Sequence, residues 1–327
     1  MYFTSDLMMS THFLLSAKAR SISLREVFCM GEEKAWDLFK QMRWPENNGR
    51  PICPRCGCTE AYDIATRRKH KCKACHHQFS VTSGTILASR KMSFTDLLAA
   101  IVILVNGAKG ISALQLCRDL DCQHKTAFVL AHKLREALAA ESKNRTLHGI
   151  VEVDGCYVGG HIRPANMAKD RVDRRLAKYQ TGKRRVVIVM RERNGKTLTA
   201  VTKYENEGIE IIKQRVSSCA IVHADEASHW DELHGYFEVK RINHQQAYSH
   251  LGACTNWAES FFSRLRLMVG GQHHHVSPQH LHQYAAHAAW MEDHRRDDNG
   301  KLARNVVSSV MAHPVSRIWK GYWQRNI

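Results

Sequence analysis

Three acidic residues stand in a pattern that suits metal-assisted chemistry on phosphate groups. Asp154 lies in the alternating, strand-like stretch GIVEVDGCYVGG, and Asp225 ends the apolar, strand-like stretch CAIVHAD. Glu259 lies in TNWAESFFSRLRLM, whose apolar spacing predicts a helix, and 33 residues separate it from Asp225. Three carboxylates can hold two Mg²⁺ or Mn²⁺ ions about 3.5–4 Å apart, one activating an attacking oxygen and the other stabilising a leaving oxygen. The three acids therefore predict a two-metal site.

The expected helix around Glu259 carries further polar residues on one face. Asn256, Glu259, Ser263 and Arg266 follow one another at helical spacing. Apolar residues cover the remaining faces and are expected to pack against a sheet: Trp257, Phe261, Phe262 and Leu265. Other acids nearby could take the place of the first two: Glu152, Glu226 and Asp231. Glu152 is the main rival, because it shares its strand parity with Asp154.

The elements between the first two acids have an order that would bring these acids together. RRVVIVMRER and KTLTAVTKY predict two strands joined at the turn dipeptide Asn194-Gly195. A helix is expected from Glu207 to Arg215, before the strand that ends at Asp225. This order, with three strands followed by a helix and a fourth strand, is that of an RNase H-like fold. In such a fold the first and fourth strands are neighbours in the sheet. We therefore predict an α/β catalytic domain with an RNase H-like mixed sheet over residues 148–298.

Four cysteines have the spacing of a structural zinc site. Two CxxC pairs, Cys53 with Cys56 and Cys72 with Cys75, are separated by fifteen residues. Each pair can direct two sulfurs at one Zn²⁺ in tetrahedral geometry, and metal binding would stabilise a segment too short for a large core. A zinc ribbon is therefore expected over residues 51–82, with a redox dithiol or a chance spacing as the alternatives. Four nearby residues are expected to be bystanders: Cys58, His70, His76 and His77.

Two helical segments flank this ribbon. An N-terminal segment, residues 1–50, carries an amphipathic helix from about Ser23 to Met42. Residues 93–142 predict three helices that resemble a helix-turn-helix, beginning after the N-cap Ser93. The last helix would be the recognition helix, with its DNA-facing residues Lys125, Thr126, His132 and Lys133; a plain helical connector is the alternative. A common core is expected from seven apolar residues: Ile111, Leu114, Leu116, Leu120, Phe128, Val129 and Leu134.

The charge of the chain indicates a polyanionic partner. There are 48 Lys and Arg against 31 Asp and Glu, a formal net charge of +17, which favours double-stranded DNA. No stretch approaches the length of a membrane-spanning helix, which needs about 18–20 consecutive apolar residues. The N-terminus does not resemble a signal peptide. The largely unpaired cysteines suit a reducing cytoplasm. We expect a cytoplasmic, nucleoid-associated bacterial protein with no membrane partner.

A basic segment and an aromatic cluster lie outside the expected site. Nine Lys and Arg fall between residues 161 and 185, where a loop could order on DNA or remain simply solvated: Arg163, Lys169, Arg171, Arg174, Arg175, Lys178, Lys183, Arg184 and Arg185. Near the C-terminus, in the expected tail of residues 299–327, Trp319, Tyr322 and Trp323 are expected to be packing residues rather than base-stacking platforms. The His273–His275 run is expected to lie in a polar loop.

At these residues the chain resembles insertion-sequence transposases of the ISXO-two-like group, which join a zinc ribbon to a DDE domain. The resemblance covers roughly Trp44 to Asp298 and rests on six stretches: RPICPRCGC, HHQFSVTSGT, VDGCYVGG, HADE, TNWAESFFSRLR and HHHVSPQHLHQYAAHAAWMEDHRRDD. It implies Mg²⁺-dependent cutting or joining of DNA ends, with recognition of terminal inverted repeats. By position, Asp154, Asp225 and Glu259 would bind the metals.

The resemblance also implies roles for two neighbours and shows one departure. Arg266 matches the cation that often follows the glutamate in DDE enzymes and would contact phosphate, and Asn256 matches a recurrent asparagine near the third acid. The stretch from Met291 to His294 replaces a more usual aromatic-Asn-Arg ending. A DNA-bound homodimer that pairs two ends and captures target DNA is expected by analogy. Two alternatives remain: a DNA-binding regulator with a non-catalytic RNase H-like domain, and a nuclease that does not join strands.

Overall fold

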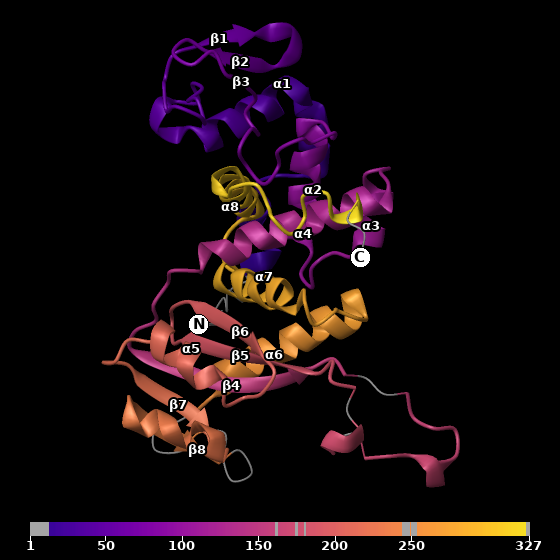
Figure 1. Ribbon diagram of the computed structural model, residues 1–327, viewed down its shortest axis with the longest axis vertical. Coiled ribbons are helices and arrows are strands. Elements are labelled where there is room, and N and C mark those ends of the chain that lie inside the picture. The colour runs from indigo at the N-terminus through magenta and orange to yellow at the C-terminus, as the bar shows by residue number, and fades with distance from the viewer. Residues whose placement is uncertain are drawn as a thin grey trace, which may run out of the picture. The chain divides into compact units, whose positions relative to one another are not determined.

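The computed structural model describes residues 13–160, 163–173, 176–179, 181–243, 249 and 254–324 (Figure 1). The chain forms two compact units. The first comprises residues 1–107, 113–134 and 294–327, and the second comprises residues 108–112 and 135–293. Among the described residues, none of the helices has the length and apolar character needed to span a bilayer.

The second unit is built on one mixed sheet of five strands. Its spatial order is β6-β5-β4-β7-β8; β4 pairs antiparallel with β5, as does β5 with β6, whereas β4–β7 and β7–β8 are parallel. The order confirms the RNase H-like sheet expected from the sequence, and β8 adds an edge strand that was not predicted. The strands are β4 (Ile150–Val158), β5 (Arg185–Glu192), β6 (Thr197–Thr202), β7 (Ile221–Asp225) and β8 (Glu238–Ile242).

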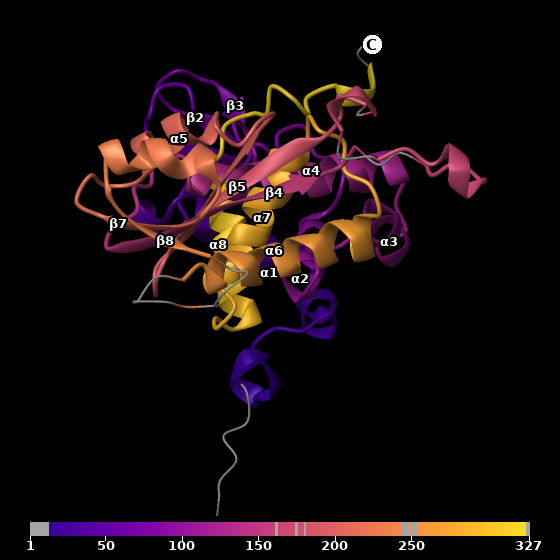
Figure 2. The ribbon, with the colours of Figure 1, turned by 90° about the horizontal axis from the view of Figure 1, so that it is seen from below.

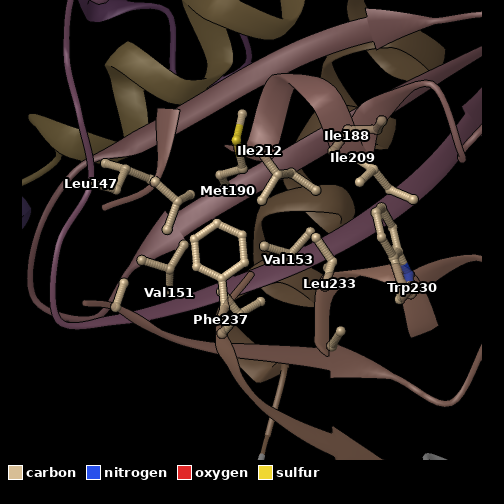
Figure 3. Close-up of a cluster of buried hydrophobic side chains, with 14 of the residues drawn as sticks. Leu147, Val151, Val153, Ile188, Met190, Ile209, Ile212, Trp230, Leu233 and Phe237 are labelled. Carbon is tan, nitrogen blue, oxygen red and sulfur yellow. The ribbon is translucent and has the colours of Figure 1, made fainter. Parts of the chain in front are cut away.

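One face of this sheet is covered by α5 (Gly208–Arg215) and the turn η7 (Ser228–Gly235). Apolar side chains from these elements meet alternate residues of β4 and β5 in a closed core, which Figure 3 shows in close-up. Val151 and Val153 belong to this core. Because side chains alternate along a strand, the residues between them point to the opposite face. The labelled members of the core include Ile188, Met190, Ile209, Ile212, Trp230 and Leu233.

The opposite face of the sheet is covered by α6 (Asn256–Leu267) and α7 (Leu281–Asp293). A π-helical turn, η8 (Met268–His273), follows α6. Figure 1 shows α6 and α7 beside the sheet. Three sheet residues and several helix residues form this second core: Cys156, Val187, Val189, Ala258, Phe261, Phe262, Leu265 and Ala285. Asp154 and Cys156 have the same parity on β4, so Asp154 belongs to the face that α6 covers.

The first unit contains a small antiparallel sheet and three packed helices. The sheet consists of β1 (Ala61–Ile64), β2 (Lys69–Cys72) and β3 (Gln78–Phe79). The helices α1 (Leu24–Arg43), α2 (Phe94–Asn106) and α8 (Asn299–Ala312) pack on one another, and Figure 2 shows them together.

Local sequence explains where these three helices begin. Ser23 and Glu26 form a reciprocal capping box at the start of α1, which satisfies two backbone N–H groups that have no partner within the helix. Ser93 and Asp298 accept hydrogen bonds from the backbone N–H groups of Asp96 and Lys301 and so cap α2 and α8. The expected starts after Ser23 and Ser93 are therefore confirmed.

The helices α3 (Ala113–Asp119) and α4 (His124–Glu141) occur where the helix-turn-helix was expected, but two details of that expectation are wrong. Leu114 was assigned to a common core and is 51% exposed. His132 was assigned to the DNA-facing surface and is 1% exposed, with its ring stacked on Trp319 at 4.2 Å between centroids. The partner of His132 lies almost two hundred residues away in sequence, so helical periodicity could not reveal it.

Candidate active site and zinc cluster

Asp154 and Asp225 lie on neighbouring parallel strands at the same height. The register pairs Ile150 with Ile221 and Glu152 with His223, and two further residues along each strand lead to Asp154 and Asp225. Neighbouring strands are about 4.8 Å apart, and residues of equal parity point to the same face. The sheet therefore brings these two carboxylates to one face, at the point where β7 ends.

Glu259 is positioned by the way α6 is attached to β4. The carboxylate of Glu152 accepts hydrogen bonds from the backbone N–H groups of Trp257 (2.8 Å) and Ala258 (3.2 Å). These N–H groups belong to the first turn of α6, where the helix dipole favours a negative charge. Glu152 is fully buried and also pairs with Arg193 at 3.0 Å. The main rival of Asp154 thus has another role, which is to hold the start of the helix that carries Glu259.

Three further contacts extend this attachment. One guanidinium nitrogen of Arg193 lies 3.1 Å from His223 Nδ1 and 2.6 Å from Cys254 Sγ, and the Cys254 backbone N–H lies 3.2 Å from His223 Nδ1. We call Glu152, Arg193, His223 and Cys254 the α6 anchor. Since its members come from β4, the β5–β6 turn, β7 and the residues before α6, it joins every element that carries one of the three acids.

The far end of α6 also contacts β4. A guanidinium nitrogen of Arg266 lies 3.3 Å from the sulfur of Cys156. From Glu152 to Cys156 the strand rises about 13 Å, and from Ala258 to Arg266 the helix rises about 12 Å. These lengths match, so α6 runs along β4 in the same direction. Asp154 is the residue midway between the two contacts, on the strand face that α6 covers.

The electrostatics of Asp154 are consistent with acids that lie near one another. The pKa of Asp154 is raised to about 7, first by its burial and then by the negative charges of Asp225, Glu259 and Glu205. A hydrogen bond from the backbone N–H of Gly155 to the Asp154 carboxylate, at 2.7 Å, opposes this rise. A carboxyl that resists ionisation because it is partly buried and lies near like charges is a common feature of metal and catalytic sites.

Asn256 and Arg266 share the exposed side of α6, and Glu259 is partly buried. The apolar residues Ala258, Phe261, Phe262 and Leu265 are buried against the sheet. Trp257, which was expected to pack there, is instead 38% exposed, with the guanidinium of Arg191 lying 4.9 Å from its ring centroid.

The other acids near the strand ends differ from the set of three. Glu226 is exposed, and Asp231 is an exposed partner of Arg241 at 2.9 Å. Glu205 was not singled out from the sequence, although it raises the pKa of Asp154. It lies against Gly155, where an added Cβ would be 2.9 Å from its carboxylate oxygen. Because Gly155 and Asp154 have opposite parity, Glu205 approaches from the other face of the sheet.

The donor set of the three acids fits hard divalent cations, because carboxylate oxygens are the ligands that Mg²⁺ and Mn²⁺ prefer. In the part of the chain that the structure describes, the four cysteines are the one group of three or more metal-ligating side chains within 4.8 Å of one another. The three acids do not form such a group among the described residues, so their binding of metal ions belongs to the proposed function.

The zinc cluster consists of Cys53, Cys56, Cys72 and Cys75. The sulfurs of Cys53 and Cys75 are 3.6 Å apart, and those of Cys56 and Cys72 are 3.5 Å apart. Four sulfurs each about 2.3 Å from one Zn²⁺ are separated by similar distances. The cluster supports the expected structural zinc.

His70 lies outside this cluster. Its Nδ1 lies 2.6 Å from Asp63, and its ring packs among Trp36, Trp44 and Phe79. These contacts give the ribbon a small aromatic core beside the metal-binding thiols, consistent with His70 being a bystander to the metal.

The basic segment between β4 and β5 is largely exposed. Arg163, Lys169, Arg171, Lys178 and Lys183 are exposed, and Arg184 and Arg185 at the start of β5 are half-buried. Arg174 and Arg175 lie outside the described residues. In Figure 1 this segment projects away from the sheet, at the lower right. Its cations are therefore available to a polyanion.

The departure from the resembled pattern at residues 291–294 has a packing explanation. Glu292 is buried and pairs with Arg191 at 2.7 Å and with Arg264 of α6. Asp293 accepts a hydrogen bond from the backbone N–H of Thr197 at 2.9 Å. Glu292 and Asp293 therefore attach α7 to α6 and to the sheet.

Comparisons with known proteins agree with this architecture. The ISXO2-like transposase domain matches residues 146–293, and the transposase zinc-ribbon domain matches residues 30–78. Together the two matches span more than half of the chain, and they include the three acids and all four cysteines. No curated protein and no solved structure matched the chain. With both domains present, the resemblance inferred from the sequence is confirmed, and the chain belongs to the ISXO2-like transposases.

Proposed function

We propose that this transposase cleaves DNA at the terminal inverted repeats of an insertion sequence and joins the freed ends to target DNA, using two divalent metal ions. The observation that carries the proposal is the geometry of the acids: β4 and β7 bring Asp154 and Asp225 to one face of the sheet, and α6, which carries Glu259, is attached along that face of β4. Burial, together with the negative charges of Asp225, Glu259 and Glu205, raises the pKa of Asp154 to about 7. Three carboxylates forced together in this way gain most from binding cations, because cations remove their mutual repulsion.

Asp154, Asp225 and Glu259 would hold the ions, and Mg²⁺ or Mn²⁺ would supply charge stabilisation for the attacking and leaving oxygens. Each acid comes from a different element, so the α6 anchor must keep β4, β7 and α6 in register for all three to act together. Asn256, at the start of α6, would orient a phosphate or sugar oxygen beside Glu259. Arg266 would donate hydrogen bonds to a phosphate, a geometry that suits a guanidinium group.

DNA binding would use surfaces beyond the acids. The exposed cations between β4 and β5 would contact phosphates, which predicts that affinity falls steeply with salt. Joining requires two DNA ends in one complex, so we propose a DNA-bound dimer, in which two-fold symmetry would match two inverted repeats. The zinc ribbon, with exposed Arg55, Arg67 and Lys71, would add a second DNA contact.

A cleavage and joining assay tests the proposal. The substrate is a labelled duplex carrying the inverted repeats that flank the gene, with a supercoiled target and Mg²⁺. We expect the wild type to produce both cleaved and joined products, and Asp154→Asn to produce neither. Glu226→Gln, which changes the exposed neighbour of Asp225, is the matched control and should retain both activities.

Three results would contradict the proposal or narrow it. No cleavage by the wild type under any divalent-metal condition would support the DNA-binding regulator. Cleavage without joining would support the nuclease. Unchanged cleavage by Asp154→Asn would remove Asp154 from the metal-binding set.

A further inference from the structure

The first unit contains a groove of about 640 Å³ that belongs to neither of the matched domains. Its walls are residues 87–92, the N-terminal part of α4 and residues 315–324 near the C-terminus. We call it the α4 groove. Its volume falls within the range of about 300–1,000 Å³ that is usual for small-ligand sites. The α4 residues that line it include Lys125, Thr126 and Lys133. These are residues that the sequence pattern predicted to lie on a recognition helix.

The C-terminal wall of the α4 groove is held firmly against α4. The backbone N–H of Ile86 donates to His313 O at 2.9 Å, which joins the segment after the ribbon to the end of α8. Trp319 is 1% exposed, with its ring 4.2 Å from that of His132 and 5.8 Å from that of Phe128. The buried tryptophan therefore anchors residues 315–324 as a fixed part of the fold.

The charge of the α4 groove favours an anionic ligand. Five of its lining residues are cations, and none of the lining residues in the described part of the chain is acidic. The cations come from all three walls, so they surround the groove instead of forming one surface stripe. The five are Arg90, Lys91, Lys125, Lys133 and Lys320.

An accessible aromatic platform stands beside these cations. Trp323 is 46% exposed, and it packs edge-on against Tyr322 with 5.2 Å between ring centroids. The ammonium group of Lys125 lies 5.5 Å from the Trp323 ring centroid. Trp323 thus differs from buried Trp319: one ring holds the wall in place, and the other offers a face to a ligand. Exposed aromatic rings with adjacent cations are the common binding surface for unpaired nucleic-acid bases.

The same wall narrows the approach of double-stranded DNA to this face of α4. An α-helix with its side chains is about 10–12 Å across and already fills the major groove, which is about 12 Å wide. Residues 315–324 add a second chain segment against Phe128 and His132. The exposed Lys125 and Thr126 therefore lie in a setting that suits a single strand better than the major groove of a duplex.

We propose that the α4 groove binds an unpaired segment of a DNA strand, with a base stacked on Trp323 and phosphates bound by Lys125, Lys133 and Lys91. Strand cleavage and joining expose such segments at DNA ends, so the site would complement the proposed activity, but its binding does not require catalysis. The inference consequently stands or falls independently of the metal site.

The test measures binding of a fluorescently labelled single-stranded oligonucleotide and of the matching duplex by anisotropy, in Mg²⁺-free buffer with the full chain. Trp323→Ala should weaken single-strand binding by about 5- to 150-fold, the range expected for loss of one stacked base, and leave duplex binding unchanged. Lys125→Ala should reduce the slope of log affinity against log salt by about 0.7, the loss of one phosphate contact on a single strand.

Two matched variants control for general effects. Tyr236→Ala removes another exposed ring (51% exposed), and Lys301→Ala removes an exposed lysine of α8 that pairs with Asp297. Both should bind the single strand as the wild type does. Melting temperatures should show that every variant is folded.

Three outcomes overturn the inference. If Trp323→Ala binds the single strand as tightly as the wild type does, the α4 groove is not the binding site for unpaired DNA. An equal loss of duplex binding means that residues 315–324 contact duplex DNA instead. A gain in duplex binding means that these residues act as a cover over α4, and that the groove is an autoinhibitory contact.

Discussion

The two metal sites of this chain are built on opposite principles. In the zinc ribbon, four cysteines already lie within 4.8 Å of one another beside a small aromatic core, so the metal site is also part of the centre of the local fold. In the RNase H-like domain, two hydrophobic cores hold the sheet, and the three acids lie on its central strands and on the helix that covers one face, where they repel one another. One metal therefore stabilises the structure, and the other would serve the reaction that the structure supports.

The largest difference is expected on removal of zinc. Binding of structural zinc contributes on the order of 10–16 kcal/mol in zinc-finger peptides, far more than a ribbon of this size can otherwise gain from burial. Cys72→Ser should lose about one equivalent of zinc per chain and unfold the ribbon, as measured by atomic emission and limited proteolysis, while residues 135–293 keep their protection. Cys58→Ser, a neighbouring cysteine outside the cluster, should retain its zinc. If Cys72→Ser retained its zinc, the proposed structural role of the four-cysteine site would be wrong.

The next effect concerns the α6 anchor. Glu152→Ala leaves the Arg193 guanidinium without its buried carboxylate and two helix N–H groups without an acceptor, a change that costs about 3–5 kcal/mol for a buried pair. We expect a clear fall in the midpoint of denaturant unfolding, together with loss of cleavage. Glu232→Ala removes an acid of the exposed Lys213 pair and should cost less than about 1 kcal/mol. Equal stability of the two variants would show that Glu152 does not hold α6.

A smaller effect should appear in the pH dependence of stability without divalent metal. The pKa of Asp154 is about 7 in the folded chain, against an ordinary value of 3.8 for an aspartate, so the folded state binds the proton more tightly. The resulting stability is fully present below pH 4 and is lost as the pH rises through 7. Asp154→Asn cannot ionise, so it should melt at least about 2–4 °C above the wild type at pH 8, with a smaller difference at pH 5.

Glu226→Gln controls for a general change in charge at this strand end. It should show no such gain at pH 8, because Glu226 is exposed. A wild type and an Asp154→Asn variant with the same melting temperature at both pH values would contradict the proposed crowding of the acids.

Sequence reasoning succeeded where the determining pattern is local. Strand alternation, the Asn194-Gly195 turn and the CxxC spacing predicted the sheet order and the cysteine cluster, because each depends on neighbouring residues. The functions of Glu152 and His132 depend on partners more than one hundred residues away, Trp257 and Trp319. Periodicity along a single strand or helix contains no information about such partners.

The same limit applies to Glu205. It lies after β6 in a stretch without a recognisable motif, and it approaches Asp154 only because Gly155 leaves space on the other face of β4. The choice between Asp154 and Glu152 was likewise open from strand parity alone. In the folded chain Glu152 is occupied with α6, whereas Asp154 is surrounded by acids.

The central claim is that Asp154, Asp225 and Glu259 together bind two catalytic metal ions. Its most direct test is the uptake of Mn²⁺ by the zinc-loaded chain bound to uncleaved inverted-repeat DNA, measured from the electron paramagnetic resonance signal of free Mn²⁺. The account predicts two Mn²⁺ per chain for the wild type, with lower uptake by Asp154→Asn and unchanged uptake by Glu226→Gln. Equal uptake by the wild type and Asp154→Asn would contradict it.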